Sequence, residues 1–322
     1  MPMEYQKITL KEVNGRILQR LEQDAMTGYV SEVGMKTTSS SAEEKYGWLG
    51  QVPGLREWVG SRQIKRLNEF DYTLRNKKYE TTLGFNQDDL DRDKTGQIEI
   101  RISEMGERAD AHWAELIGDL IDGGDTTGGE CYDGEYFFDT DHSSGSSGTL
   151  VNNVTSSHVS ALNVSTATAP TAIEMASALI GCLGYFYTYK DDQGKYINRG
   201  AKRFVCVCPT IPIYSAAVSA VSKMTLTTGG GASVDNPFQG AGYTVTVELD
   251  PSLSSNTTNF WLFRTDASVK PFILQEESTI KVQALGEDSD HYFFEDEMLF
   301  GIKLKRAAGY GLWQYAMQAT LS

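Results

Sequence analysis

The sequence lacks any long hydrophobic run. None of its apolar stretches approaches the roughly 18–20 residues that a helix needs to cross a bilayer, and the N-terminus, MPMEYQKITLKEV, has no hydrophobic signal core. We therefore expect neither a membrane span nor a cleaved export signal. The 322 residues, 40% of them hydrophobic and 22% charged, suffice for one large folded domain or two ordinary ones.

Cysteine and histidine are scarce, with four of each. Cys206 and Cys208 alternate along the apolar run RFVCVCP, so both side chains point to one side if the run is a strand. No second cysteine pair and no neighbouring histidine completes a four-ligand zinc site. We therefore expect the cysteines, which also include Cys131 and Cys182, to be buried and reduced, as in a reducing cytoplasm.

Basic residues are also few, because 29 Lys and Arg stand against 43 Asp and Glu, for a formal net charge of −14. A protein that grips DNA as its main task needs a basic face to neutralise phosphates. The charge balance argues against that class of protein. It is compatible with a protein that encloses DNA without adhering to it.

Familiar catalytic and nucleotide-binding motifs are missing. The sequence has no G-x-x-x-x-G-K-[ST] phosphate loop, no G-x-G-x-x-G after a strand and no G-x-S-x-G elbow. Asp89, Asp91 and Asp93 imitate the start of a calcium loop. However, the sixth position of that loop is Lys94 rather than glycine, and the twelfth is Ile100 rather than glutamate. These aspartates indicate a solvated acidic loop.

The densest group of potential ligands lies in CYDGEYFFDTDH, from Cys131 to His142. Asp139, Asp141 and His142 are close enough in sequence to hold a divalent ion, as in a metal-dependent hydrolase. The other histidines are scattered, so no second ligand-bearing motif supports this hypothesis. The alternative is a hydrogen-bonded turn that uses the same polar side chains for structure.

Several segments predict helices, among them IPIYSAAVSAVSKM directly after RFVCVCP. Residues 8–26 combine a capping box with an apolar face, and residues 97–122 keep the longest helical stripe before a Gly-Gly pair. A second capping box, Thr171 with Glu174, begins another helix. Farther along the chain, RFVCVCP, YTVTVEL, NFWLFR and KPFILQEE predict strands, and the C-terminal segment predicts two more around an Ala-Gly-Tyr-Gly turn.

Residues 72–83 predict a hairpin, with two alternating runs on either side of the turn Arg75-Asn76-Lys77-Lys78. The hairpin and the residues before it carry basic side chains in an otherwise acidic protein. An isolated two-stranded ribbon is marginal in water. We therefore expect a projecting hairpin that docks on an acidic surface of a neighbouring copy. The alternative is a hairpin that lies on its own domain.

Several segments, in order, resemble one family, the major head subunit of Mu-like phages and prophages. The distinctive matches are YGWLGQVPGLREWVGSR, KKYETTLGFNQDDLDRDKTG and CYDGEYFFDTDH. RFVCVCPTIPIYSAA, NFWLFR with KPFILQEE, and FGIKLKRAAGYGLWQYA add weaker support. The third match is expected to be a structural motif of Cys131, Tyr132, Asp133, Gly134, Phe137, Phe138, Asp139, Asp141 and His142.

The resemblance implies an α+β architecture, the Hong Kong 97-type phage capsid fold. Its parts would be an N-terminal arm over residues 1–52 and an extended loop over residues 53–96. A peripheral domain with a long spine helix would take residues 97–165 and 286–322. An axial domain would take residues 166–285.

The implied function is that of a major capsid protein of a tailed double-stranded DNA phage or prophage, with no enzymatic activity and no cofactor. Copies are expected to form hexamers and pentamers that close into an icosahedral shell and enclose DNA without sequence-specific binding. Implied partners are a scaffold protein, a portal and a decoration protein, with no membrane. The shell would be assembled in the host cytoplasm and become part of the virion. The candidates for contacts between copies are Trp48, Trp58, Arg62, Arg66, Lys77 and Lys78.

Three other functions remain open from sequence. An encapsulin-like nanocompartment shell shares the implied fold but encloses an enzyme cargo. A metal-dependent hydrolase would use Asp139, Asp141 and His142. A tail or decoration protein would not close into shells.

Overall fold

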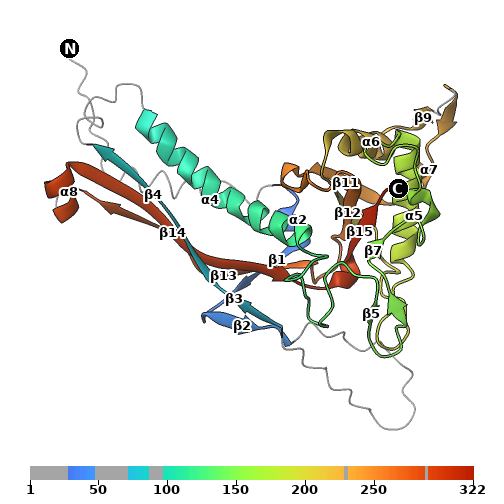
Figure 1. Ribbon diagram of the computed structural model, residues 1–322, viewed down its shortest axis with the longest axis horizontal. Coiled ribbons are helices and arrows are strands. Elements are labelled where there is room, and N and C mark those ends of the chain that lie inside the picture. Colours follow the sequence, from blue (N-terminus) through green and yellow to red (C-terminus); the bar gives the residue numbers. More distant parts are fainter. Residues whose placement is uncertain (1–27, 48–71, 87–96, 228–230, 287–288) are drawn as a thin grey trace, which may run out of the picture.

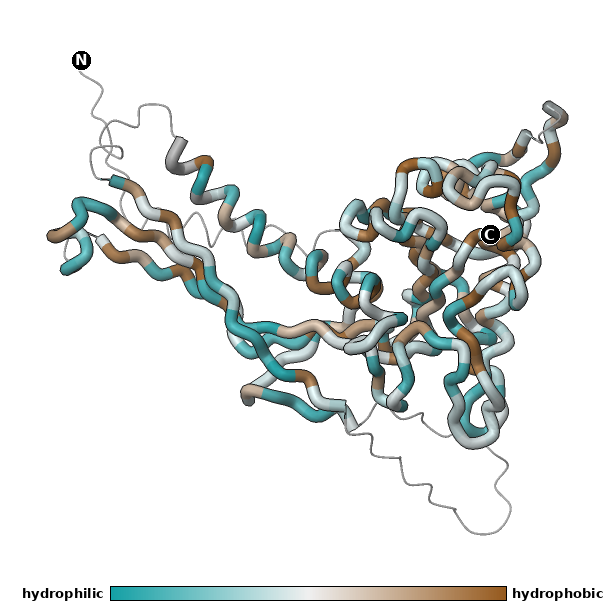
Figure 2. Tube along the Cα trace, in the orientation of Figure 1, coloured by the Kyte–Doolittle hydropathy of each residue, from teal (hydrophilic) through white to brown (hydrophobic). Residues whose placement is uncertain are grey.

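The computed structural model describes residues 28–47, 72–86, 97–227, 231–286 and 289–322. A long, narrow sheet extends to one side of the molecule, and a thicker lobe that contains the C-terminus lies on the other (Figure 1). Hydrophobic residues alternate with hydrophilic ones along the narrow sheet and cluster in the lobe (Figure 2).

The described elements follow one another along the chain as short strands, one long helix, and then a mixed succession of helices and strands. The helices, with the 3₁₀ turns marked η, are α2 (Val30–Val33), α4 (Gln97–Asp122), η2 (Ser160–Leu162), α5 (Ala172–Phe186), α6 (Ile211–Ser222), α7 (Pro237–Gly240), η3 (Pro251–Leu253), α8 (Asp290–Glu295) and η4 (Trp313–Tyr315). The strands are β1 (Gly34–Thr38), β2 (Glu43–Lys45), β3 (Thr73–Arg75), β4 (Lys77–Asn86), β5 (His142–Ser143), β6 (Thr149–Leu150), β7 (Asn153–Val154), β8 (Arg203–Cys208), β9 (Thr225–Thr227), β10 (Ser233–Asp235), β11 (Thr244–Leu249), β12 (Asn259–Arg264), β13 (Phe272–Leu285), β14 (Glu297–Tyr310) and β15 (Ala316–Thr320).

The narrow sheet has the strand order β1-β13-β14-β4. β1 runs parallel to β13, whereas β14 runs antiparallel to both β13 and β4. Alternate side chains of β14, from Met298 to Leu304, are buried with Met105 and Ala109 of α4. This period of two is what a strand with one covered face requires. The opposite face is covered in part, since Ile273 of β13 is buried against Tyr46 and Leu74, whereas Lys281 and Gln283 farther along β13 are exposed.

The long helix α4 spans Gln97–Asp122, which are the predicted bounds. It lies along the narrow sheet and its C-terminal end reaches the lobe (Figure 1). The helix ends where Gly123 N donates to Asp119 O at 2.9 Å and Gly124 N donates to Ile121 O at 3.4 Å. The prediction of a long helix stopped by a Gly-Gly pair is confirmed.

The lobe is built on a second sheet with the order β11-β8-β12-β15-β7. β8 is buried from Phe204 to Cys208, so its continuous apolar run is that of a strand covered on both faces. The predicted capping box is present, since Thr171 Oγ1 accepts from Glu174 N while the Glu174 carboxylate accepts from Thr171 N. The helix it begins, α5, packs with α6 beside this sheet.

All four cysteines are free and buried, as predicted. Cys206 Sγ and Cys208 Sγ lie 3.8 Å apart on one side of β8. No helix in the described ranges combines the length and apolar character that a bilayer crossing requires.

The predicted hairpin of residues 72–83 is wrong. β3 pairs with β2, and β4 pairs with β14, so the two predicted arms do not pair with each other. Between them, Asn76 Nδ2 donates to Ser39 Oγ at 3.0 Å and to Ser41 O at 2.9 Å. An alternating run predicts a strand but does not identify its partner. Residues 53–71 and 87–96 of the predicted extended loop lie outside the described residues, as does the predicted helix 8–26.

Two strand pairings join segments that were predicted to lie in different domains. β13 and β14, on either side of the boundary at residue 286, pair along most of their length. β15, predicted to belong with the spine helix, pairs with β12 in the sheet of the lobe. The C-terminal segment therefore joins both sheets, β14 in the narrow sheet and β15 in the lobe.

Candidate functional site

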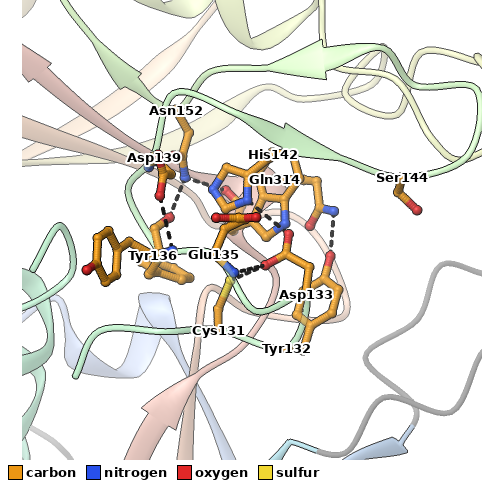
Figure 3. Close-up of polar contacts among 12 residues, drawn as sticks. Cys131, Tyr132, Asp133, Glu135, Tyr136, Asp139, His142, Ser144, Asn152 and Gln314 are labelled. Atoms are coloured by element: carbon orange, nitrogen blue, oxygen red, sulfur yellow. Dashed lines mark hydrogen bonds and ion pairs between the residues drawn. The ribbon is translucent and has the colours of Figure 1, made fainter. Parts of the chain in front are cut away.

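The segment Cys131–His142 forms a tight turn at the junction between α4 and the two sheets (Figure 3). Cys131 N donates to Glu135 O at 2.8 Å, and Gly134 N donates to Cys131 O at 3.1 Å. Gly134 has a φ of 91°, a backbone conformation that side-chain-bearing residues rarely adopt. The sequence Asp133-Gly134 is a typical turn signal, and the structure gives it that role.

Inside the turn, Asp133 is the centre of a polar cluster. Its Oδ1 accepts from Cys131 Sγ at 2.9 Å, and its Oδ2 lies 2.9 Å from His142 Nδ1 (Figure 3). Burial of the Asp133 carboxyl raises its pKa, but the hydrogen bond and charge of His142, with hydrogen bonds from Cys131 and from Glu135 N, together lower the pKa below its usual range. Burial and the neighbouring Asp133 carboxylate raise the pKa of the Cys131 thiol. The thiol is therefore protonated at neutral pH and is not an activated nucleophile.

His142 is fully buried and stacks on Trp313, with ring centroids 3.9 Å apart and an interplanar angle of 9°. Next to it, Gln314 Nε2 donates to the Tyr132 hydroxyl at 2.6 Å. These contacts join the turn to η4, about 170 residues later in the chain. The imidazole is part of a packed interface rather than a group open to substrate.

Phe137 and Phe138 attach the same turn to the spine helix and the narrow sheet. The Phe137 ring stacks on Tyr310 of β14 with centroids 4.6 Å apart, and Phe138 N donates to Gly124 O at 2.8 Å. Asn152 Nδ2 donates to Phe137 O at 2.7 Å and its Oδ1 accepts from Asp139 N at 2.8 Å. The segment Cys131–His142 therefore connects α4, the narrow sheet and the lobe, and we call it the clasp.

The alternative hypothesis of a metal set formed by Asp139, Asp141 and His142 does not match the structure. The structure splits it, because His142 lies with Cys131 and Asp133, whereas Asp139 and Asp141 lie with the exposed Glu135. The reason is that His142 begins β5 and points inward to Trp313, while the aspartates before it remain at the surface.

Contacts within the turn account for the placement of both groups. In the first, His142 Nδ1 lies 2.9 Å from Asp133 Oδ2, and the fully buried ring stacks on Trp313, so packing and this one polar contact hold the imidazole. In the second, Asp139 accepts from Tyr136 N at 3.2 Å and from Thr140 N at 2.6 Å, as a turn-forming aspartate does. The hydrogen bond with Asp139 and the charge of that carboxylate raise the pKa of Asp141.

Replacement of Asp133 by asparagine is expected to lower the free energy of unfolding by about 1–3 kcal/mol at neutral pH, since a buried charge-assisted hydrogen-bond acceptor is lost. The lowered pKa of Asp133 means that its contribution is present above the pKa of an unfolded aspartate, about 3.9, and is lost as the pH falls below it. Urea unfolding at several pH values checks both effects. Glu135→Gln, at an exposed neighbour, is the control. Equal stability loss in both variants would contradict the role given to Asp133.

The predicted contact residues Lys77 and Lys78 lie at the start of β4 and are exposed. In the register of the sheet they stand opposite Arg306 and Lys305 of β14. The other predicted contact residues, Trp48, Trp58, Arg62 and Arg66, lie outside the described residues.

Comparison with known proteins decides the family. The family model described as "Mu-like prophage major head subunit gpT" matches residues 14–171 and 233–321, well over half of the chain. The chain belongs to this family. The match includes α4, the clasp, and the strands β13 and β14 of the narrow sheet.

Two relatives of this Mu-like head subunit agree with that assignment. The major capsid protein of Escherichia phage Mu is 28% identical over 296 residues, which cover 92% of this chain and 67% of that protein. The Mu-like prophage FluMu major head subunit of Haemophilus influenzae is 37% identical over 112 residues, which cover 35% of this chain and 36% of that protein. The subunit is thus a major capsid protein of a tailed phage or prophage.

The fold is also shared with solved capsids. The structure titled "Procapsid of bacteriophage JBD30" matches with a TM-score of 0.54 and 24% identity over 97% of this chain and 74% of that one. This similarity confirms the α+β Hong Kong 97-type capsid fold that the sequence resemblance implied.

Two surface features of this head subunit were not predicted from the sequence. One is a lysine cluster on the solvent face of the narrow sheet, formed by Lys281 of β13 with Lys303 and Lys305 of β14. The other is the adjacent pair Phe293 and Phe294 of α8, which are 82% and 77% exposed. The alternation in IKLKR and the Phe-Phe pair between acidic residues were the available signals.

Proposed function

We propose that copies of this head subunit join as hexamers and pentamers, and that these close into an icosahedral shell around double-stranded DNA. The observation that carries the proposal is the family match across the spine helix, the narrow sheet and most of the lobe. The shape supports it, since a subunit with a long, two-faced sheet beside a lobe offers several separate edges to neighbours. Stable contacts between proteins bury about 1,600 Å² each.

The proposed role is structural rather than enzymatic. The densest group of potential catalytic side chains, the clasp, uses its histidine for stacking and its aspartates for turns. Its thiol has a raised pKa and is buried. These observations favour a protein that acts through assembly and needs no cofactor.

The acidic balance of the chain supports enclosure of DNA without sequence-specific binding. A formal charge of −14 repels a polyanion held in the lumen and limits adhesion to it. We propose that assembly takes place in the host cytoplasm, with a scaffold protein and a portal as partners and a decoration protein on the finished virion.

We propose the four-part division into arm, extended loop, peripheral domain and axial domain at about residues 1–52, 53–96, 97–165 with 286–322, and 166–285. Strand pairing suggests two adjustments. β13 pairs with β14 and is better grouped with the peripheral part, and β15 pairs with β12 and is better grouped with the axial part.

Sedimentation and negative-stain electron microscopy test the proposal. The chain, expressed together with the products of its neighbouring genes, is expected to yield closed particles that sediment far ahead of a 35.6 kDa monomer. Particles isolated from infected cells are expected to contain double-stranded DNA, whereas a nanocompartment would contain an enzyme cargo. A subunit that stays monomeric under all these conditions would refute the proposal. Emptied shells are expected to bind added DNA weakly even at low salt.

A further inference from the structure

The outer end of the narrow sheet is an exposed aromatic tip, here defined as Ser289–Glu297. Within it, α8 connects β13 to β14, and Phe293 and Phe294 are 82% and 77% exposed. Their rings contact each other edge to face, with centroids 5.3 Å apart. Figure 1 shows α8 at the far end of the sheet, and the colours of Figure 2 show hydrophobic residues in this part of the chain.

The tip is a folded element rather than a frayed connection. Ser289 Oγ accepts from Tyr292 N at 3.2 Å at the start of α8, and Asp296 closes its end with a φ of 53° and a bond from its N to Tyr292 O of 2.9 Å. His291 Nε2 lies 3.1 Å from Glu297 Oε2, and the Tyr292 ring packs against the buried face of the sheet. The structure therefore holds the two phenylalanines outward.

The tip is also acidic. Asp290, Glu295 and Asp296 surround the aromatic pair and are all exposed. An apolar pair with a ring of carboxylates matches a partner surface that offers apolar contact and cations. It does not match a second tip, because like charges brought together at an interface are repulsive.

A basic hollow, defined by Ser278, Lys281, Gln283, Lys303 and Lys305, lies on the solvent face of the same sheet. It has a volume of about 360 Å³ and also includes Glu277 and Leu304. Two irregularities in the pairing of β13 with β14, between Glu276 and Ser278 and between Ser278 and Lys281, open the sheet at this point. Bulges of this kind re-aim side chains and are common beside functional sites.

The lysines of the hollow face one another. Lys281 stands directly opposite Lys303 across β13 and β14, and Lys305 stands opposite Lys78 across β14 and β4. Like charges directly opposite on a sheet destabilise it. Lys305 pairs with Glu277, but Lys281 and Lys303 form no salt bridge with any described carboxylate. Glu80 of β4 stands opposite Lys303 on its other side, so among the described residues the positive charge of the hollow is greatest at Lys281.

One copy cannot bring its own tip to its own hollow. The strands β13 and β14 remain paired from Lys281–Lys303 out to Leu285–Leu299, and the tip follows immediately. This paired stretch holds α8 roughly 13 Å or more along the strand from the hollow, at about 3.3 Å per residue. A matching acidic tip must come from another molecule.

We propose that the tip of one copy binds the basic hollow of a second copy. The carboxylates of Asp290, Glu295 and Asp296 face Lys281 and Lys303, and the phenylalanine rings cover the lysine stems, with cation–π attraction to the ammonium groups. The contact joins two different surfaces, so it is heterologous and can repeat around a ring that closes. The inference rests on the proposed shell, which supplies neighbouring copies.

A charge swap between the two surfaces tests the contact. Lys303→Glu is expected to lower the yield of particles by about tenfold or more, because it places like charges across a close interface. Lys303→Arg keeps the charge and is expected to assemble normally. Adding Glu295→Lys to Lys303→Glu is expected to restore the yield. Thermal melting of the unassembled subunits verifies that each variant folds. Wild-type yield for Lys303→Glu, or no rescue by the swap, would overturn the inference.

A cysteine cross-link in wild-type-like particles gives a second test that needs no loss of assembly. All four native cysteines are buried, so introduced surface cysteines can be oxidised selectively. Ser278→Cys combined with Phe294→Cys is expected to give a ladder of covalent multimers in particles. Phe294→Cys alone is expected to stay monomeric on a denaturing gel. Particles that show no ladder, or dimers from Phe294→Cys alone, would overturn the proposed contact but leave the shell proposal intact. If the unmodified chain forms no particles at all, the shell proposal itself is contradicted.

Discussion

Trp313→Ala is expected to remove about 3–5 kcal/mol from the free energy of unfolding. Trp313 is 1% exposed, stacks on His142 at 3.9 Å, and lies where the clasp meets the lobe. The substitution leaves a cavity beside a buried imidazole whose Nδ1 contacts Asp133. Single domains are stable by only about 5–15 kcal/mol, so this one change should make the subunit marginal.

Urea unfolding monitored by circular dichroism measures the effect. Met224→Ala is the matched control, because Met224 is 80% exposed and its truncation is expected to change the free energy of unfolding by no more than about 0.5 kcal/mol. A Trp313→Ala variant as stable as this control would contradict the clasp as a centre of stability.

Gly311→Ala is expected to destabilise the subunit by about 1–3 kcal/mol or more, because the new methyl group overpacks the site. A Cβ at residue 311 meets Lys270 O at 2.5 Å and Pro271 O at 2.9 Å. Both atoms belong to the backbone, so neither can move aside without a shift of the chain. Gly311 N also donates to Pro271 O at 2.7 Å, which fixes the close approach of the two segments between the sheets.

Gly184→Ala is the matched comparison for this prediction. Gly184 lies within α5, and a Cβ there meets nothing within 4 Å. The same chemical change is therefore expected to stabilise the protein by about 0.5–1 kcal/mol, since alanine is the better helix former. Thermal or urea unfolding of the two variants measures the change in the free energy of unfolding, which is expected to be a loss for Gly311→Ala and a gain for Gly184→Ala. Destabilisation of similar size at both positions would contradict the steric argument for Gly311.

The sequence was sufficient for elements whose signals are local. The stripe and Gly-Gly stop of α4, the Thr171–Glu174 capping box and the buried run of β8 each depend on neighbours within a few residues. The resemblance to Mu-like head subunits added the overall fold, which these local signals do not determine.

Pairings between distant segments were not predictable in the same way. The alternating runs around Lys77 predicted strands correctly. However, β3 pairs with β2, and β4 pairs with β14, which lies more than 200 residues later in the chain. Alternation sets which face is buried and says nothing about which strand lies alongside. The basic hollow has the same origin, because only the register of β13 against β14 brings Lys281 to Lys303.

The candidate metal site failed for a related reason. Asp139, Asp141 and His142 are neighbours in sequence, yet the side chain of His142 turns into the core while the aspartates remain outside. Trp313, the residue on which His142 stacks, lies about 170 residues later in the chain, and no residue near His142 in the sequence predicts this contact. The resemblance predicted which residues form the clasp, whereas their contacts required the structure.

A cryo-electron microscopy reconstruction of the assembled particle tests the central claim most directly. The account predicts a closed icosahedral wall in which rings of six and five copies of this chain fill the density, with the narrow sheet and lobe folded as described. A wall built from another protein, or preparations in which this chain remains a discrete monomer or dimer, would contradict it.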